Sequence, residues 1–252
     1  MDYYNTGIKD VIKVYPKIGD LLAAYDVDCV ACAVGTCLLK DVLDIHNFSP
    51  DEKNVINRQM EQIMNKEEVD LSAIPQAQDR KKPSISKAIK MLMDEHRNIL
   101  RLLDLAQYLA DRRELTVQNM ETLDRLVFFI RNYADKYHHA KEENILFART
   151  GENQEIIKAM LTEHVMGRNF VSEAVAGAKV NSREQIRQGL CGYIDLLREH
   201  IRKEDTILYP WFDRAMSDSE KDGLFEEFEA VKGKLDANLE ESLLEFLDAN
   251  YA

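Results

Sequence analysis

Apolar residues between positions 85 and 209 recur at alternating intervals of three and four, which is the spacing of helices that bury one face. The pattern predicts four long helices, at about 85–111, 117–149, 154–178 and 183–209. Residues that cap or interrupt helices stand at these boundaries: Ser84 or Ser86, Thr116, Ser182 and Pro210. Short connections make consecutive helices antiparallel, so the predicted fold class is all-α, with an up-down four-helix bundle.

The four predicted helices form two internal repeats. The first and third share an apolar stripe at an offset of 68 positions, and each stripe has one polar member, a histidine: His96 and His164. The second and fourth match at an offset of 62, where HHAKEENILF from His138 aligns with HIRKEDTILY from His200. Two similar helical hairpins that face each other across one core account for both offsets.

The remaining chain divides into three segments. Residues 1–70 carry short apolar stripes and a helix start, Ser-Pro-Asp-Glu from Ser49, which together predict a small helical domain. Residues 71–84, LSAIPQAQDRKKPS, have the composition of a linker. Residues 216–252 are predicted to form an acidic helical tail, which leaves 85–215 as the bundle domain.

Composition narrows the classes of partner. Of the 252 residues, 45% are hydrophobic and 31% are charged, which is enough apolar matter for a core and argues against disorder. A net charge of −12 disfavours nucleic acid and anionic membrane surfaces as partners. The sequence lacks a bilayer-spanning apolar run of ~18 residues and a secretory signal pattern at its start. We therefore expect a cytoplasmic protein, and the sequence does not indicate its oligomeric state.

Histidine and glutamate side chains are predicted to gather in the middle of the bundle. Residues four apart lie on one helix face, so His138 points the same way as Glu142, and His200 the same way as Glu204. With the two stripe histidines the set holds four imidazoles and two carboxylates: His96, His138, Glu142, His164, His200 and Glu204. Such ligands suit iron, manganese or zinc, and the stoichiometry predicts two metals bridged by both carboxylates, with two histidines on each.

An alternative interpretation needs no metal. Each histidine would then be a core residue bonded to a backbone carbonyl, within a helical interaction protein. Against this alternative, burying Glu142 and Glu204 without partners would cost several kcal/mol.

Residues 85–215 resemble the hemerythrin-like HHE cation-binding domain, in particular that of the repair-of-iron-centres proteins. The resemblance rests on DEH at Asp94, HHAKEENILF at His138, TEH at Thr162 and EHIRKEDTILYP at Glu199. It implies a centre of two non-haem iron ions, with the four histidines as terminal ligands and the two glutamates as bridges; manganese and zinc are the substitutes. Oxygen-carrying hemerythrins have an additional histidine ligand and a different carboxylate pattern.

Three further residues near these motifs are candidates for supporting roles. His139, beside His138, is expected to point away from the core stripe, at the surface or in support of the ligands. Glu163 and Tyr209 are candidates for support of the ligands or for a channel, with simple packing or solvation as the alternative.

The N-terminal segment carries a cluster of cysteines that is a candidate for redox chemistry. Cys29 and Cys32 form a C-x-x-C pair, and Cys37 follows five residues later. Thiols at this spacing can cycle between dithiol and disulfide or bind a metal; the alternative is buried cysteines in a small core. The segment resembles the DUF1858 or ScdA-type N-terminal domains, in which the cysteines are adjacent.

Two functions follow from the resemblance. The first is a di-iron protein of nitrosative or oxidative stress that binds NO or O₂, reduces NO or donates iron to damaged iron–sulfur clusters. Its partners would be a diatomic ligand and a redox partner or iron–sulfur apoprotein. The second is a sensor or binding module for O₂, iron or redox state that acts without turnover.

Overall fold

The computed structural model describes residues 3–27, 29, 37–46, 48–74, 85–149, 155–232 and 238–250. These residues are helical with short connections, and their extended pairing consists of an isolated bridge between Gly7 and Leu38. The predicted all-α fold class is therefore confirmed. Contacts divide the chain into two units, residues 1–84 with 206–215 and residues 85–205 with 216–252. None of the described helices is long and apolar enough to cross a membrane.

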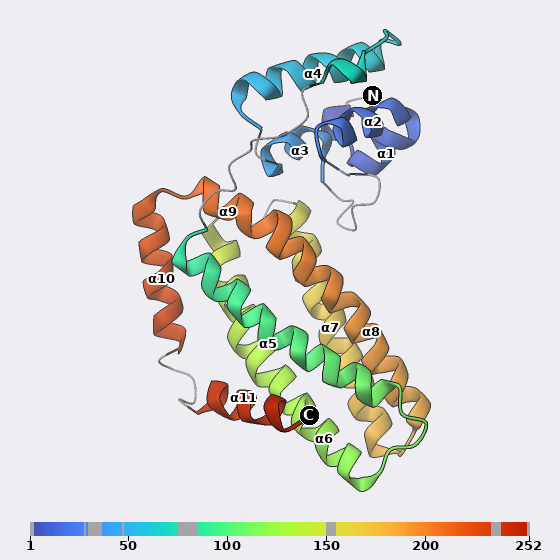
Figure 1. The fold of residues 1–252 in the computed structure, drawn as a ribbon, viewed down its shortest axis with the longest axis vertical. Coiled ribbons are helices and arrows are strands. Elements are labelled where there is room, and N and C mark those ends of the chain that lie inside the picture. The colour runs from blue at the N-terminus through green and yellow to red at the C-terminus, as the bar shows by residue number, and fades with distance from the viewer. Residues whose placement is uncertain are drawn as a thin grey trace. The chain divides into compact units, whose positions relative to one another are not determined.

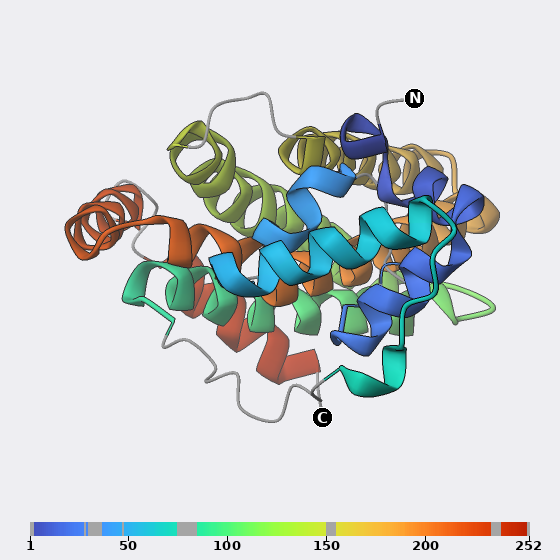
Figure 2. The ribbon, with the colours of Figure 1, turned by 90° about the horizontal axis from the view of Figure 1, so that it is seen from above.

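The first unit contains short helices, and α1–α4 gather into one group (Figures 1 and 2). Its helices and turns are η1 (Tyr3–Asn5), α1 (Ile8–Val14), α2 (Pro16–Ala24), α3 (Leu39–Ile45), α4 (Pro50–Met64), η2 (Leu71–Ala73) and α9 (Tyr209–Ala215). Ser49 caps α4 in a reciprocal box with Glu52, as its sequence predicts. Apolar side chains such as Ile18 and Leu21 are fully buried in this unit.

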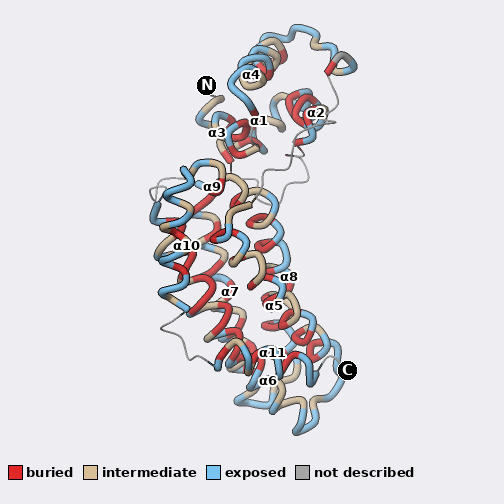
Figure 3. The backbone as a smooth tube through the Cα atoms, turned by 60° about the vertical axis from the view of Figure 1, so that its left-hand side comes forward, coloured by how far each residue is buried: buried red, intermediate tan, exposed pale blue. Residues whose placement is uncertain are grey.

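The second unit is built on a ring of four long helices. They are α5 (Lys87–Ala110), α6 (Val117–Phe129) with its continuation, α7 (Glu155–Lys179) and α8 (Arg183–Lys203). Each packs on the next in chain order and α8 returns to α5 (Figure 1). Buried residues line their inward faces (Figure 3). Ser86, Thr116 and Ser182 accept hydrogen bonds from the first turns of α5, α6 and α8, so these predicted caps are confirmed.

The second and fourth predicted helices are present, but they are not α-helical along their whole length. Beyond α6 the chain continues as the π-helices η3 (Ile130–His139) and η4 (Glu142–Leu146) and a 3₁₀ turn, η5 (Phe147–Arg149). Beyond α8 it forms the π-helix η6 (Glu204–Leu208). The helical path then runs through Pro210 to the end of α9, further than predicted. Wide π turns commonly occur at functional sites, and all three lie at or next to the predicted metal ligands.

The C-terminal segment packs on the bundle. Ser217 caps α10 (Asp218–Lys232) together with Glu220, and both α10 and α11 (Leu239–Asn250) contact α5. On α11 the Phe246 ring stacks on Phe129 with ring centroids 5.1 Å apart. The predicted helical tail therefore extends the apolar core of the bundle domain.

Glycines let α7 and α8 approach each other closely. A Cβ atom on Gly189 would lie 2.5 Å from the backbone nitrogen of Ala174 and 2.7 Å from the carbonyl oxygen of Phe170. A Cβ on Gly177 would lie 2.7 Å from the backbone nitrogen of Ile186. These obstacles are backbone atoms, which cannot move aside as a flexible side chain can.

We predict that Gly189→Ala destabilises the protein by about 1–3 kcal/mol, because overpacking outweighs the gain in helix propensity. The matched control is Gly223→Ala on α10, where nothing lies within 4 Å of the added Cβ. The control is expected to raise stability by up to about 1 kcal/mol. Urea unfolding measures both changes, and equal effects at the two positions would contradict the close α7–α8 contact.

Candidate metal centre

The six predicted ligands come together inside the bundle, and His139 joins them. The structure forms two groups in which one ligand atom per residue lies within 4.8 Å of the others. The His139 group consists of His139, Glu142, His164 and His200, and the His96 group consists of His96, His138, Glu142 and Glu204. All seven side chains are buried.

Each of the two carboxylates lies between imidazoles of both groups. A Glu142 oxygen is 3.7 Å from Nε2 of His138 and 3.5 Å from Nε2 of His164. The Glu204 oxygens lie 3.3 Å from Nε2 of His96 and 3.1 Å from Nε2 of His200. Carboxylates placed in this way are suited to bridge two cations, since each lies between nitrogen donors of the two groups.

Carboxylates outside the two groups fix the orientation of the imidazoles. Four rings place Nδ1 within hydrogen-bond distance of an acidic side chain: His96 with Asp205 (2.7 Å), His138 with Glu95 (2.9 Å), His164 with Glu143 (2.7 Å) and His200 with Glu163 (2.8 Å). An Nδ1–H that donates to a carboxylate leaves the Nε2 lone pair directed inward, the tautomer that binds a metal. The four rings are therefore arranged as ligands.

This outer set repeats the internal symmetry of the sequence. The Lys141 ammonium contacts Glu95, the partner of His138, and the Lys203 ammonium contacts Glu163, the partner of His200. The offsets of 68 and 62 relate every member of one trio to the other. The ammonium of Lys141 also lies 3.8 Å above the Tyr137 ring. Two buried lysines thus balance the charge of the acids that hold the ligands.

His139 departs from the sequence prediction and breaks this symmetry. It is buried, not at the surface, and its ring stacks on His164 with centroids 3.9 Å apart. Its Nδ1 lies 3.8 Å from Asp135, a looser contact than the other four. A wide π turn rotates neighbouring residues by less than an α turn does, so both His138 and His139 face inward. A signal was present, because the repeat aligns His139 with the apolar, buried Ile201.

Without a metal, protons take the place of cations at this site. Burial alone would lower the pKa values of His96 and His200. The carboxylates around these rings nevertheless raise the pKa of His96 to about 9 and that of His200 to about 10. Burial and repulsion from neighbouring imidazoles lower the pKa of His139 to about 3 and hold that of His138 well below its ordinary value. The carboxylates therefore favour a positive charge on His96 and His200, whereas burial favours the neutral form of His138 and His139.

The donor set fits metal ions. The buried Nε2 of His138 has no hydrogen-bond partner among the described residues, although its lone pair points at the cluster. The Nε2 atoms of His164 and His200 lie 2.9 Å apart, as expected for two donors that converge on one position. Five imidazoles and two carboxylates are ligands preferred by iron, zinc and manganese.

The other predicted residues divide as follows. The structure places Glu163 beside His200, in a supporting position. Tyr209 is fully buried in the unit that contains the N-terminal helices, and its role stays a prediction. Cys29 and Cys37 are buried, and Cys32 lies outside the described residues, so redox chemistry of this cluster also stays a prediction.

Comparison with known families assigns the same region to a family. The family described as hemerythrin HHE cation binding domain matches residues 87–212, half of the chain. The chain belongs to this family. The matched residues contain both four-residue groups, so the hemerythrin HHE domain of this chain carries its buried histidines and glutamates where a cation-binding role needs them.

Two relatives of this HHE protein come from mycobacteria. They are the uncharacterized protein Rv1995 of Mycobacterium tuberculosis and the uncharacterized protein Mb2018 of Mycobacterium bovis. Each is 26% identical over 150 residues, which covers 55% of this chain and 58% of the relative. The match thus spans less than two thirds of these relatives. No solved structure matches the chain.

We predict that Asp205→Asn weakens metal affinity by about 10–100-fold, because the amide holds the His96 ring less firmly than the carboxylate does. Asp195→Asn, an exposed change on α8, is the matched control and should leave affinity unchanged. Competition with a chelator of known affinity measures both. Equal affinities in the two variants would exclude a supporting role for Asp205.

We predict that His139→Leu selectively weakens one metal position, because it removes one of three imidazoles from the His139 group and none from the His96 group. Metal content should fall from two ions per chain toward one under mild chelation. The control is His46→Leu, which alters the one histidine of the chain outside the cluster. If His139→Leu retains both ions with unchanged affinity, His139 is a packing residue.

Proposed function

We propose that this chain holds a carboxylate-bridged pair of iron ions that binds NO or O₂ in the response to nitrosative or oxidative stress. The observation that carries the proposal is the pair of buried ligand groups that share Glu142. A reduced iron pair supplies electrons and coordination positions for a diatomic ligand. Reduction of NO, or donation of iron to damaged iron–sulfur clusters, is the activity that we assign to it.

The residues of the chain would do three things for such a centre. The acids bonded to Nδ1 hold each imidazole with its Nε2 atom aimed inward. Glu142 and Glu204 neutralise part of the metal charge between the two positions. The surrounding core excludes bulk water, which strengthens both interactions. A redox partner would supply electrons for NO reduction, or an iron–sulfur apoprotein would accept the donated iron.

The bridging assignment is tested with Glu142→Gln. We expect loss of one ion or more per chain, because a neutral amide cannot bridge two cations and metal binding is coupled to folding. Glu121→Gln, an exposed change on α6, is the control. Metal analysis of protein purified without oxygen measures the content, and Mössbauer spectra identify coupled iron. Unchanged iron content in Glu142→Gln would contradict the bridge.

The activity is tested on the same anaerobic preparation. NO is added to the reduced, iron-loaded chain with an electron donor, and N₂O is measured in the headspace. Repeated formation of N₂O supports NO reduction. Reversible binding of NO or O₂ without product supports the sensor alternative. If the chain binds neither NO nor O₂, the proposal is overturned.

A further inference from the structure

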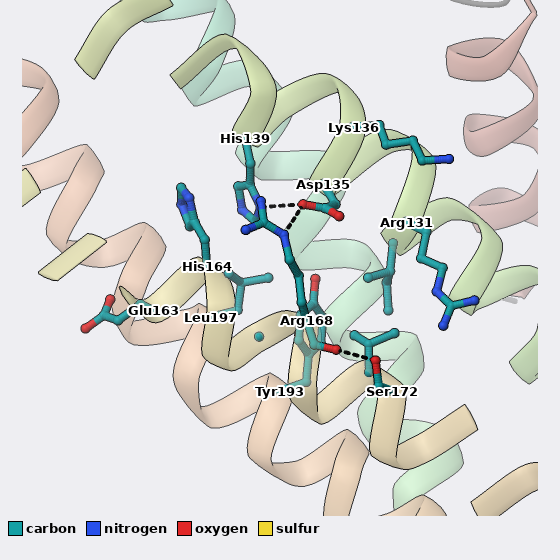
Figure 4. Close-up of a pocket in the computed structure, with 13 residues that line it drawn as sticks. Arg131, Asp135, Lys136, His139, Glu163, His164, Arg168, Ser172, Tyr193 and Leu197 are labelled. Carbon is teal, nitrogen blue, oxygen red and sulfur yellow. Dashed lines mark hydrogen bonds and ion pairs between the residues drawn. The ribbon is translucent and has the colours of Figure 1, made fainter. Parts of the chain in front are cut away.

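A cavity adjoins one of the two ligand groups. It has a volume of about 240 Å³ and lies between η3, α7 and α8. His139 and His164 form part of its wall, and both belong to the His139 group (Figure 4). Neither His96 nor His138 lines it. The cavity therefore reaches the candidate centre from the side of the His139 group.

The internal repeat places larger residues at the corresponding positions of the other hairpin. The offset of 68 relates Gly167 and Val171, which line the cavity, to Ile99 and Leu103. Both counterparts are buried in the apolar core and are larger, so their side chains fill the corresponding volume. At one position the size difference is reversed, because the offset of 62 relates Ile130, which lines the cavity, to the smaller Gly192. No space opens beside Gly192, because the Phe170 ring covers it.

Polar residues at the wall of the cavity are already engaged with each other. The Arg168 guanidinium lies 2.8 Å from Asp135 and 2.6 Å from Glu143, so it connects α7 with the acids that hold His139 and His164. The charged ends of Arg131 and Lys136 point away from the two histidines (Figure 4). No unbalanced positive charge among these described residues would hold an anion next to the ligand groups.

The size and lining of the cavity define the class of molecule that it accepts. Apolar surface from Gly167, Val171, Tyr193 and Leu197 suits a neutral guest. A volume of about 240 Å³ is below the range of roughly 300–1,000 Å³ that is typical of sites for drug-sized ligands. The cavity volume is several times the ≈ 30 Å³ that one molecule occupies in liquid water.

We infer that this cavity is the entrance through which a small neutral diatomic molecule reaches the candidate centre, at the position held by His139, His164 and His200. The inference rests on the proposed function, and it adds the route of access and a preference for neutral ligands over anions. Gly167 and Val171 determine the access, since the repeat places larger residues at the corresponding positions of the other hairpin.

The cavity itself is tested with xenon, which binds apolar cavities without any reaction. The probe is xenon gas added to the full chain loaded with zinc, a diamagnetic ion, with amide NMR shifts as the readout. We expect shifts around Gly167 and Val171 in the wild type and their loss in Val171→Phe. Val165→Phe is the matched control, with the same substitution on the same helix at an exposed position. Absence of xenon shifts in the wild type would overturn the inference.

The entrance is tested by the rate at which NO binds the reduced, iron-loaded chain. Val171→Phe and, independently, Gly167→Ile should slow association at least tenfold while iron content stays at the wild-type value. Val165→Phe should bind NO at the wild-type rate. If both cavity variants retain iron and bind NO at the wild-type rate, the inference is wrong even though the proposed function stands. If the wild type binds neither NO nor O₂, the proposed function fails, and the xenon result still shows whether the cavity is apolar.

Discussion

The rest of this structure depends on two carboxylates that are buried at the centre of a helical bundle. Glu142 and Glu204 have no exposed surface, so their negative charge must be balanced inside the protein. Imidazoles of four helical segments surround them, and these rings are in turn held by further acids. Positive and negative groups alternate outward from the centre, which makes the arrangement stable only as a set. Cations bound at the middle would provide the balance that protons on His96 and His200 provide otherwise.

The surrounding fold is adapted to this polar centre. Away from it the helices pack as an ordinary apolar core, and α7 and α8 approach through glycines such as Gly189. Near it the backbone changes to π turns, which bring consecutive residues inward at a cost in regular hydrogen bonding. Lys141 illustrates the same adaptation, since it is fully buried against Glu95 and the Tyr137 ring. A bundle without a charged centre would need neither the π turns nor the buried lysine.

Much of this could be predicted from the sequence, because it depends on local periodicity and on an internal repeat. Helix boundaries at Ser86 and Thr116 follow from side chains that cap the next turn. The six candidate ligands follow from helical spacing and the internal repeat. The inward position of His139 could not be predicted in this way, because α-helical spacing directs it away from His138. The π turn that brings it inward depends on tertiary packing, which the local sequence does not encode. The supporting acids were also missed in part, although the repeat places one beside each ligand, as Glu143 and Asp205 show.

The repeat also separates two tasks within the site. Features common to both hairpins, such as the lysine–glutamate–histidine trios, support candidate ligands of both groups. Features on one side alone can serve only the ligand group on that side. Arg168, His139 and Gly167 are of this kind, with Leu100, Ile201 and Ile99 at the corresponding positions. They all lie at the cavity wall next to one ligand group. These three differences between the hairpins thus lie where an external molecule would enter, and they make the surroundings of one ligand group different from those of the other.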